Sequence, residues 1–366
     1  MKTRLKDIPA NTNGLHLGVR ELLFVLVVAV ALVWGVLPFW HRHALKVTLD
    51  KDFRFSYALR DDYLLYRATV KQACQEFDTL FLGDSVIWGM YVRNDSTLTA
   101  CLNRSAGEEK YGNLAIDGLH PVAMETLLRN YAGDLRGKKV YLYLNPLWLN
   151  TPLYDLSGEG ETSINHPRLL PQFDFSLKCY HGTLQERCNA QRERLLDFYA
   201  LLHHWRVCFF DNRDFKSWIA KHPGENPLSL LRMEISPLEE GHSSNSTVDW
   251  YESGIAEQDW PWMALEDSRQ WRAFQQCLRI LQKRGNDVTV LVGSINPHMQ
   301  TAESLAKCRA LREEMQGRLA KDGVSAILLP ELPSEEYGDA SHPLAAGYRR
   351  LADFLVVKVA CSDGVL

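Results

Sequence analysis

The sequence lacks any concentration of positive charge. Its 366 residues carry a formal net charge of −4 at pH 7, and the sequence pI is about 6.3. A surface that binds nucleic acid needs a basic patch or stripe facing the phosphates. We therefore expect no nucleic-acid partner.

Nucleotide-binding motifs and low-complexity stretches are also missing. The chain contains neither a phosphate-cradling glycine-rich loop nor a Walker lysine motif, so nucleotide chemistry is not expected. Its apolar content is 46%, and at this length the chain can bury a sizeable core. Composition alone thus indicates an ordinary globular protein, with one large domain carrying insertions or two smaller domains.

The cysteines and histidines lack the paired spacing of a structural zinc site. There are no two Cys-x-x-Cys pairs, and His203 and His204 are adjacent, which on a helix turns their side chains apart. We expect neither a metal nor another cofactor. The even count of eight cysteines is compatible with disulfides in an oxidising compartment, and Cys179 and Cys188 are the closest pair.

One long apolar run stands near the N-terminus. Residues 22–40 are almost entirely apolar and carry no charge, close to the roughly 20 residues that span a bilayer as a helix. We predict a transmembrane anchor over residues 22–40 that follows a cytoplasmic N-terminus, residues 1–21. Four positive residues precede the run and favour a cytoplasmic N-terminus: Lys2, Arg4, Lys6 and Arg20. Arg42 and Lys46 follow the run closely and reduce this charge asymmetry.

The rest of the chain is then extracytoplasmic. Residues 41–77 form a predicted juxtamembrane stem, because apolar residues between 61 and 77 recur at helical spacing. Residues 78–366 form the predicted catalytic domain. The protein is accordingly expected to be a single-pass membrane protein whose catalytic domain is periplasmic or on the cell surface.

Strand-like and helix-like segments alternate after residue 77, which predicts a parallel sheet. The predicted strands are residues 78–82, 113–116, 139–144, 287–292 and 325–329. The main predicted helices are residues 86–92, 121–131, 267–284, 301–321 and 344–359.

A long insertion over about 150–265 divides this pattern. Its clearest predicted helix covers residues 190–203. Its five tryptophans could form a platform for a sugar or a lid over the site, or fill a small satellite core: Trp205, Trp218, Trp250, Trp260 and Trp262.

Four turns that follow predicted strands carry residues suited to acyl-transfer chemistry. Ligands of open parallel sheets bind at the carboxyl ends of the strands, where these turns meet. Ser85 is a candidate nucleophile, His342 its base, and Asp339 the acid that orients the base. The backbone N–H groups of Ser85 and Gly118 and the side-chain amide of Asn145 are candidate donors to an oxyanion.

Each of these residues has a purely structural alternative. Ser85 could cap the following helix, and the turn from Asp339 to His342 could be a helix entry. Gly118 could merely permit a turn, and Asn145 could satisfy loop backbone.

The four turns, in this order, resemble the four sequence blocks of the SGNH/GDSL hydrolase superfamily. Gly83-Asp84-Ser85 is similar to the nucleophile block and Asp339-x-x-His342 to the block of the acid and base, with Gly118 and Asn145 at the oxyanion positions. The resemblance covers roughly residues 77–150 and 285–360. It implies a three-layer α/β/α flavodoxin-like fold, here preceded by the transmembrane helix.

The resemblance implies a membrane-anchored serine esterase that acts on ester-linked groups, expected to be acetyl, of an extracytoplasmic glycan. The alternative is an O-acyltransferase of cell-surface polysaccharide that works with a multi-spanning membrane acyltransferase as the source of acyl groups. A second alternative is a non-catalytic glycan-binding or assembly protein on the same fold. His120 and His298, on turns near the predicted site, are candidate substrate-binding residues.

Overall fold

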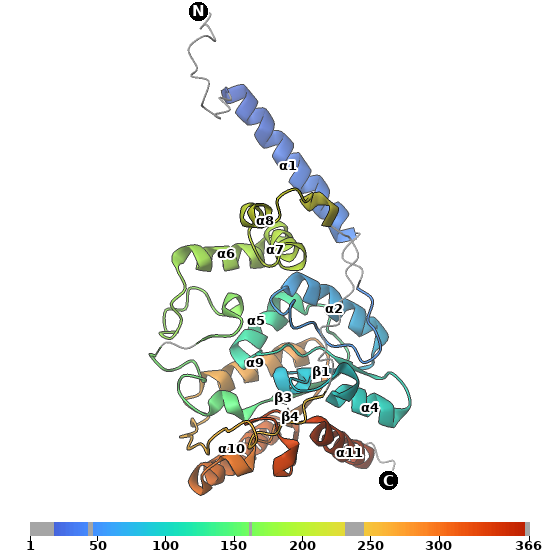
Figure 1. Cartoon of the computed structure of the whole chain (residues 1–366), viewed down its shortest axis with the longest axis vertical. Helices are drawn as coiled ribbons and strands as arrows, with labels where there is room; N and C mark the ends of the chain where they lie inside the picture. Colours follow the sequence, from blue (N-terminus) through green and yellow to red (C-terminus); the bar gives the residue numbers. More distant parts are fainter. Residues whose placement is uncertain (1–17, 43–46, 161–162, 231–244, 363–366) are drawn as a thin grey trace, which may run out of the picture. The chain divides into compact units, whose positions relative to one another are not determined.

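The computed structural model of the protein describes residues 18–42, 47–160, 163–230 and 245–362 (Figure 1). The chain divides into two compact units, Met1–Ala44 and Leu45–Leu366. The second unit contains the sheet and every residue of the predicted site.

The first unit is built on helix α1 (Val19–Arg42). Its described apolar side chains are exposed, among them Leu22, Phe24 and Val27. Across the described parts of the chain, no helix combines the length and the apolar character needed to cross a membrane. The anchor over residues 22–40 stays a prediction, and the side chains of residues 32–34 and 36–40 lie outside the described residues.

The second unit is organised around a sheet of five parallel strands in the order β2-β1-β3-β4-β5. The strands are β1 (Thr79–Leu82), β2 (Tyr111–Asn113), β3 (Lys139–Leu144), β4 (Asp287–Val292) and β5 (Ser325–Leu328). This is the flavodoxin-like order. The predicted parallel sheet is confirmed.

The strand predicted over residues 113–116 begins two residues earlier in the structure. Parallel pairing nevertheless continues beyond β2, because the N–H of Leu114 donates to the carbonyl of Phe81 at 2.9 Å, and that of Ile116 to Gly83 at 3.3 Å. The backbone up to Ile116 therefore runs beside the turn that follows β1.

Helices cover both sides of the sheet. The helices α5 (Pro121–Tyr131) and α9 (Arg269–Lys283) pack against each other, as do α4 (Leu98–Ala106) and α11 (Ala345–Ser362). In Figure 1, α5 and α9 lie above the strands and α11 lies below them. The helix α10 (Ala302–Lys321) packs against β4 and β5.

Successive side chains of a strand point to opposite faces of the sheet, so alternating residues fill the core on each side. Phe81 and Tyr141 stack with ring centroids 4.8 Å apart and belong to the cluster that contains Tyr348 of α11. The intervening residues Leu80 and Leu142 are also fully buried. Both faces of the sheet are thus shielded from solvent.

The segment predicted as a stem packs as part of the sheet unit. Helix α2 (Tyr63–Glu76) begins after Asp62, whose Oδ1 accepts the N–H of Leu65 at 3.0 Å, an N-terminal cap. Leu65 and Tyr66 are fully buried, and the Tyr66 hydroxyl donates to the carbonyl of Leu114 at 3.0 Å. This helix therefore supports the backbone that leads to Gly118.

The described part of the insertion contains three α-helices, α6 (Leu184–Leu195), α7 (Asp197–Phe209) and α8 (Phe215–Lys221). The single helix predicted over residues 190–203 is wrong, because Leu196 adopts φ −127° and ψ 105° and separates α6 from α7. Three tryptophans of the insertion, Trp218, Trp250 and Trp262, are buried. Trp250 belongs to the core cluster of the sheet unit that contains Tyr348, and Trp260 packs against the same cluster, so these two tryptophans do not form a separate satellite core.

The seven cysteines whose side chains the structure describes are all free. Cys179 is buried and Cys188 is exposed, so this closest pair in the sequence is not bonded. Cys361 lies outside the described side chains.

The packing of α2 predicts that its buried residues contribute to the stability of the sheet unit. Leu65→Ala should lower the free energy of unfolding by about 2 to 5 kcal/mol, since it removes a fully buried side chain. Lys71→Ala, on the exposed side of the same helix, should change it by less than about 0.5 kcal/mol. Denaturant unfolding of the full chain in detergent measures both, and equal effects would contradict the packing described.

Candidate active site

The turn after β1 presents Ser85 at the first position of the short helix α3 (Ser85–Trp88). A Cβ on Gly83 would lie 2.7 Å from Cγ1 of Ile87 and 3.0 Å from Cβ of Tyr143, so the close approach of these residues requires glycine. Asp84 caps the helix, because its Oδ1 accepts the N–H of Val86 at 3.0 Å. The alternative of Ser85 as the cap is therefore wrong, and its hydroxyl is free for another partner.

Ser85, His342 and Asp339 form a continuous hydrogen-bonded chain. Oγ of Ser85 lies 2.8 Å from Nε2 of His342, and Nδ1 of His342 lies 2.7 Å from both carboxylate oxygens of Asp339. With Nδ1–H donating to the carboxylate, Nε2 is left to accept the serine proton. The structure thus brings together three predicted residues from opposite ends of the domain.

The negative charge of Asp339 and the imidazole of His342 favour each other's ionised form, although both side chains are largely buried. Burial by itself lowers the pKa of His342, but the charge and hydrogen bond of Asp339 outweigh it and raise that pKa above its ordinary 6.5. For Asp339, burial favours the neutral acid, yet His342 and the N–H groups of Ser341 and His342 lower the pKa to about 2. Asp339 is accordingly ionised at neutral pH.

Two residues that the sequence did not indicate hold the acid and base in place. The Tyr91 hydroxyl donates to Oδ2 of Asp339 at 3.0 Å, and its ring meets the His342 ring edge-on at 5.7 Å between centroids. Asn296, after β4, donates its N–H to the carbonyl of Ala340 at 2.8 Å. Both contacts join segments more than forty residues apart, so no local pattern reveals them.

The two backbone groups predicted as oxyanion donors, the N–H groups of Ser85 and Gly118, lie on neighbouring turns. Ser85 begins α3, so its N–H has no acceptor within the helix. Gly118 adopts φ +70°, and the ladder that ends at Ile116 brings its turn beside the nucleophile turn. Among the described residues, neither N–H has a hydrogen-bond acceptor. Both are available to a substrate oxygen.

Asn145, the third predicted donor, is engaged within the site. Its Nδ2 donates to Oδ2 of Asp84 at 2.9 Å and lies 3.4 Å from Oγ of Ser341, while its Oδ1 accepts the N–H of Leu147. The side chain therefore links the nucleophile turn to the turn of His342. One of its two N–H groups has only the long contact to Ser341.

Trp148 forms an aromatic wall that the sequence analysis missed. Its Nε1–H donates to Oδ2 of Asp84 at 2.9 Å, and its ring lies 5.6 Å from that of His120 and 6.1 Å from that of Tyr154. Trp148 is half-buried and Tyr154 is exposed. A partly exposed aromatic surface therefore adjoins the nucleophile turn.

His120 and His298 have different surroundings from those expected. His120 is 2% exposed; its Nδ1 accepts the N–H of Ala123 at 3.3 Å and its Nε2 donates to the carbonyl of Asn165 at 3.1 Å. Burial, with a smaller contribution from His166, lowers its pKa to about 3, so it is a neutral helix cap. His298 is exposed and makes no hydrogen bond to Ser85, Asp339 or His342.

The hydrogen bond between Nε2 of His120 and the carbonyl of Asn165 also places the insertion beside the turn of Gly118. A Cβ on Gly118 would lie 2.8 Å from Nδ2 of Asn165, whose side chain is exposed. The insertion thus contributes a polar group to the wall of the site.

Comparison with known proteins adds distant structural likenesses. No protein-family model and no curated protein matches the chain. One similar solved structure is a family two carbohydrate esterase from Clostridium thermocellum in complex with cellohexaose, with 12% identity, a TM-score of 0.32, and coverage of 80% of this chain and 66% of that chain.

Another is an acetyl xylan esterase from the rumen bacterium Butyrivibrio proteoclasticus. It shows 13% identity and a TM-score of 0.31, with coverage of 79% of this chain and 65% of that chain. The chain thus spans slightly less than two thirds of the length of either esterase. Scores this low support no argument about function.

The contact between Asp339 and His342 predicts a histidine that titrates above 6.5. Asp339→Asn removes the negative charge and should lower the pKa of His342, so that the ring loses its proton at a lower pH. NMR titration of the full chain with labelled histidine checks this, with His342→Gln to assign the signal. His181→Gln, an exposed position, is the control; a His342 pKa unaffected by Asp339→Asn would contradict the arrangement.

Proposed function

We propose that the chain is a serine esterase of the SGNH type that cleaves ester-linked groups through an acyl-serine intermediate. The observation that carries the proposal is the distance of 2.8 Å between Oγ of Ser85 and Nε2 of His342, whose Nδ1 lies 2.7 Å from Asp339. A nucleophile, a base and an orienting acid in this geometry are the elements of covalent acyl transfer.

The first half of the reaction forms the acyl-enzyme. Oγ of Ser85 attacks the ester carbonyl carbon while Nε2 of His342 accepts its proton. The carbonyl oxygen becomes an oxyanion that the N–H groups of Ser85 and Gly118 bind, with Asn145 as a third donor. The intermediate then collapses, the C–O bond to the alcohol breaks, and the alcohol leaves with the proton from His342.

The second half releases the acid. Water attacks the acyl carbon, His342 accepts a proton from it, and the bond to Ser85 breaks as Oγ recovers a proton. Only neutral His342 can accept the serine proton. Because Asp339 raises the pKa of His342, the activity should increase with pH through a pKa above 6.5.

The proposed substrate is a glycan that carries acetyl esters. The partly exposed ring of Trp148 beside the nucleophile turn, with Tyr154 next to it, provides a flat surface on which a sugar ring can stack. The exposed amide of Asn165 above Gly118 can hydrogen-bond to hydroxyl groups. The acetyl group needs little space beside Ser85 and Gly118. The larger sugar would contact Trp148, Tyr154 and Asn165.

We further propose that the enzyme is anchored in a membrane by residues 22–40, with the catalytic domain outside the cytoplasm. This rests on the uncharged apolar run and the preceding positive residues. The alternative is transfer of the acyl group from Ser85 to a sugar hydroxyl, with a multi-spanning membrane protein as the acyl source. Transfer uses the same acyl-serine and differs only in what replaces water.

Hydrolysis of p-nitrophenyl acetate by the full chain in detergent tests the proposal. Ser85→Ala and His342→Ala should each lower the rate by on the order of a thousandfold or more, because each removes a group that acts in the covalent step. Ser253→Ala and His181→Ala, both at exposed positions, are matched controls that should retain the wild-type rate.

The outcomes separate the three candidate functions. Activity that survives Ser85→Ala would contradict the esterase mechanism. An acyl-glycan product formed when an oligosaccharide acceptor is added would favour transfer over hydrolysis. A wild-type chain that neither hydrolyses the ester nor transfers its acyl group would favour a non-catalytic glycan-binding role.

A further inference from the structure

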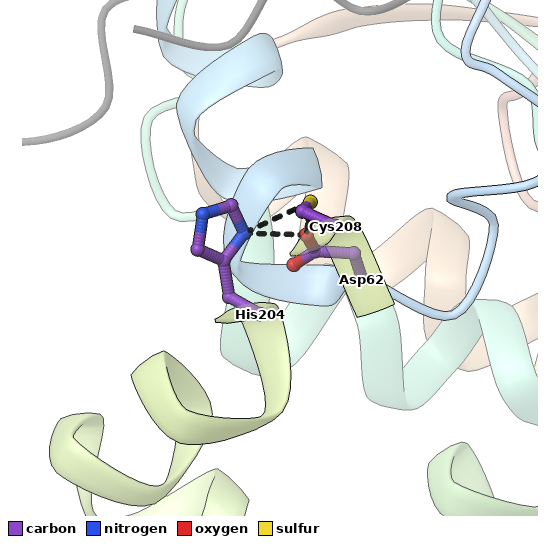
Figure 2. Close-up of side chains that lie close together, drawn as sticks. All are labelled: Asp62, His204 and Cys208. Carbon is purple, nitrogen blue, oxygen red and sulfur yellow. Dashed lines mark hydrogen bonds and ion pairs between the residues drawn. The ribbon is translucent and has the colours of Figure 1, made fainter. Parts of the chain in front are cut away.

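A second cluster of chemically active side chains lies between helices α2 and α7. It consists of Asp62, His204 and Cys208, which Figure 2 shows turned toward one another. Nδ1 of His204 lies 2.5 Å from Oδ2 of Asp62 and 3.5 Å from Sγ of Cys208, and Sγ lies 3.1 Å from Oδ2. None of the three hydrogen-bonds to Ser85, Asp339 or His342.

The two helices hold the three ligand atoms in place. His204 and Cys208 are four residues apart on α7, so their side chains share one face of the helix. Asp62 caps α2 with Oδ1, which leaves Oδ2 directed at α7. Asp62 and His204 are fully buried, whereas Cys208 is half-buried and leaves an approach from solvent.

The ring orientation of His204 also favours a ligand at Nδ1. Figure 2 shows Nδ1, and not Nε2, facing Asp62 and Cys208. Nε2 is buried and has no hydrogen-bond partner among the described residues. No contact therefore prevents the ring from carrying its proton on Nε2, which leaves the Nδ1 lone pair for a metal ion.

We propose that Asp62, His204 and Cys208 bind a zinc ion, with water in the fourth position. Imidazole, thiolate and carboxylate are the ligand types of protein zinc sites. At ordinary zinc bond lengths, the ligand atoms of a tetrahedral site lie about 3.3 to 3.7 Å apart. The 3.5 Å between Sγ and Nδ1 already matches. Sγ and Oδ2, now 3.1 Å apart, must separate by roughly 0.4 Å, and Oδ2 and Nδ1, now 2.5 Å apart, by roughly 0.8 Å.

The charge balance of the loaded site is favourable. On binding, Cys208 releases its thiol proton to solvent and coordinates as a thiolate, Asp62 coordinates as a carboxylate, and His204 coordinates as a neutral imidazole with its proton on Nε2. The two anionic ligands balance the two positive charges of the ion. Without metal, burial and the charge of Asp62 raise the pKa of the Cys208 thiol.

The site would fasten the insertion to the sheet domain near the oxyanion turn. Asp61 precedes Asp62, and its Oδ1 lies 3.4 Å from Nδ1 of His166 in the insertion. Nε2 of the same histidine donates to the carbonyl of Asp117 at 2.7 Å. Gly118 is the following residue. Zinc is therefore expected to stabilise the chain as a whole, with no part in the covalent chemistry.

Metal content of the full chain in detergent tests the proposal. After removal of metal with a chelator, loading with zinc and removal of excess, the wild type should retain about one zinc ion per chain. Cys208→Ser should lose it. Cys188→Ser, which changes an exposed cysteine outside the cluster, should retain it. Asp62 is left unchanged because its loss would also remove the cap of α2.

Cobalt in place of zinc gives an optical readout of whether a thiolate binds the metal ion. A cobalt–thiolate absorption band should appear in the wild type and in Cys188→Ser, and should be absent from Cys208→Ser. Added zinc should raise the melting temperature of the wild type but not that of Cys208→Ser. A wild-type chain without bound zinc or a cobalt–thiolate band, or zinc retained unchanged by Cys208→Ser, would overturn the proposal.

Discussion

The buried carboxylate of Asp84 joins the parts of the site that come from different turns. Its Oδ1 caps the helix that begins with Ser85, and its Oδ2 accepts one N–H from Asn145 and one from Trp148. Burial raises its pKa, which these donors partly offset. A single side chain therefore fixes the turn of Ser85, the predicted oxyanion donor Asn145 and the ring of Trp148 relative to one another.

The parallel sheet provides the second constraint. All five strands end at one edge, so residues separated by more than 250 positions, such as Ser85 and His342, can meet in one hydrogen bond. The turn of Asp339 and His342 is then held from two sides, by Tyr91 and by Asn296. Asp339 and His342 are thus held in place by residues from distant parts of the chain.

Local sequence patterns were sufficient for most of the sheet and for the three residues of the hydrogen-bonded chain. The bounds of β3, β4 and α5 match the predicted ones, because long apolar runs and helical spacing report burial directly. The break at Leu196 was missed because the helical spacing continues across it, and only its backbone angles reveal the separation.

Residues that act through distant contacts could not be found in this way. Trp148 is 64 positions from Asp84, and Tyr91 is 248 positions from Asp339. The cluster of His204 and Cys208 was overlooked for the same reason, since its third member, Asp62, is 142 positions away from His204. Such sites depend on how helices pack, which composition and spacing do not specify.

In the proposed mechanism His342 activates Ser85 as a nucleophile. Treatment of the full chain with a fluorophosphonate, followed by peptide mass spectrometry, tests this step most directly. We expect one adduct, on Ser85, that disappears in His342→Ala. An unlabelled wild-type chain, or an adduct on another residue that persists in Ser85→Ala, would contradict it.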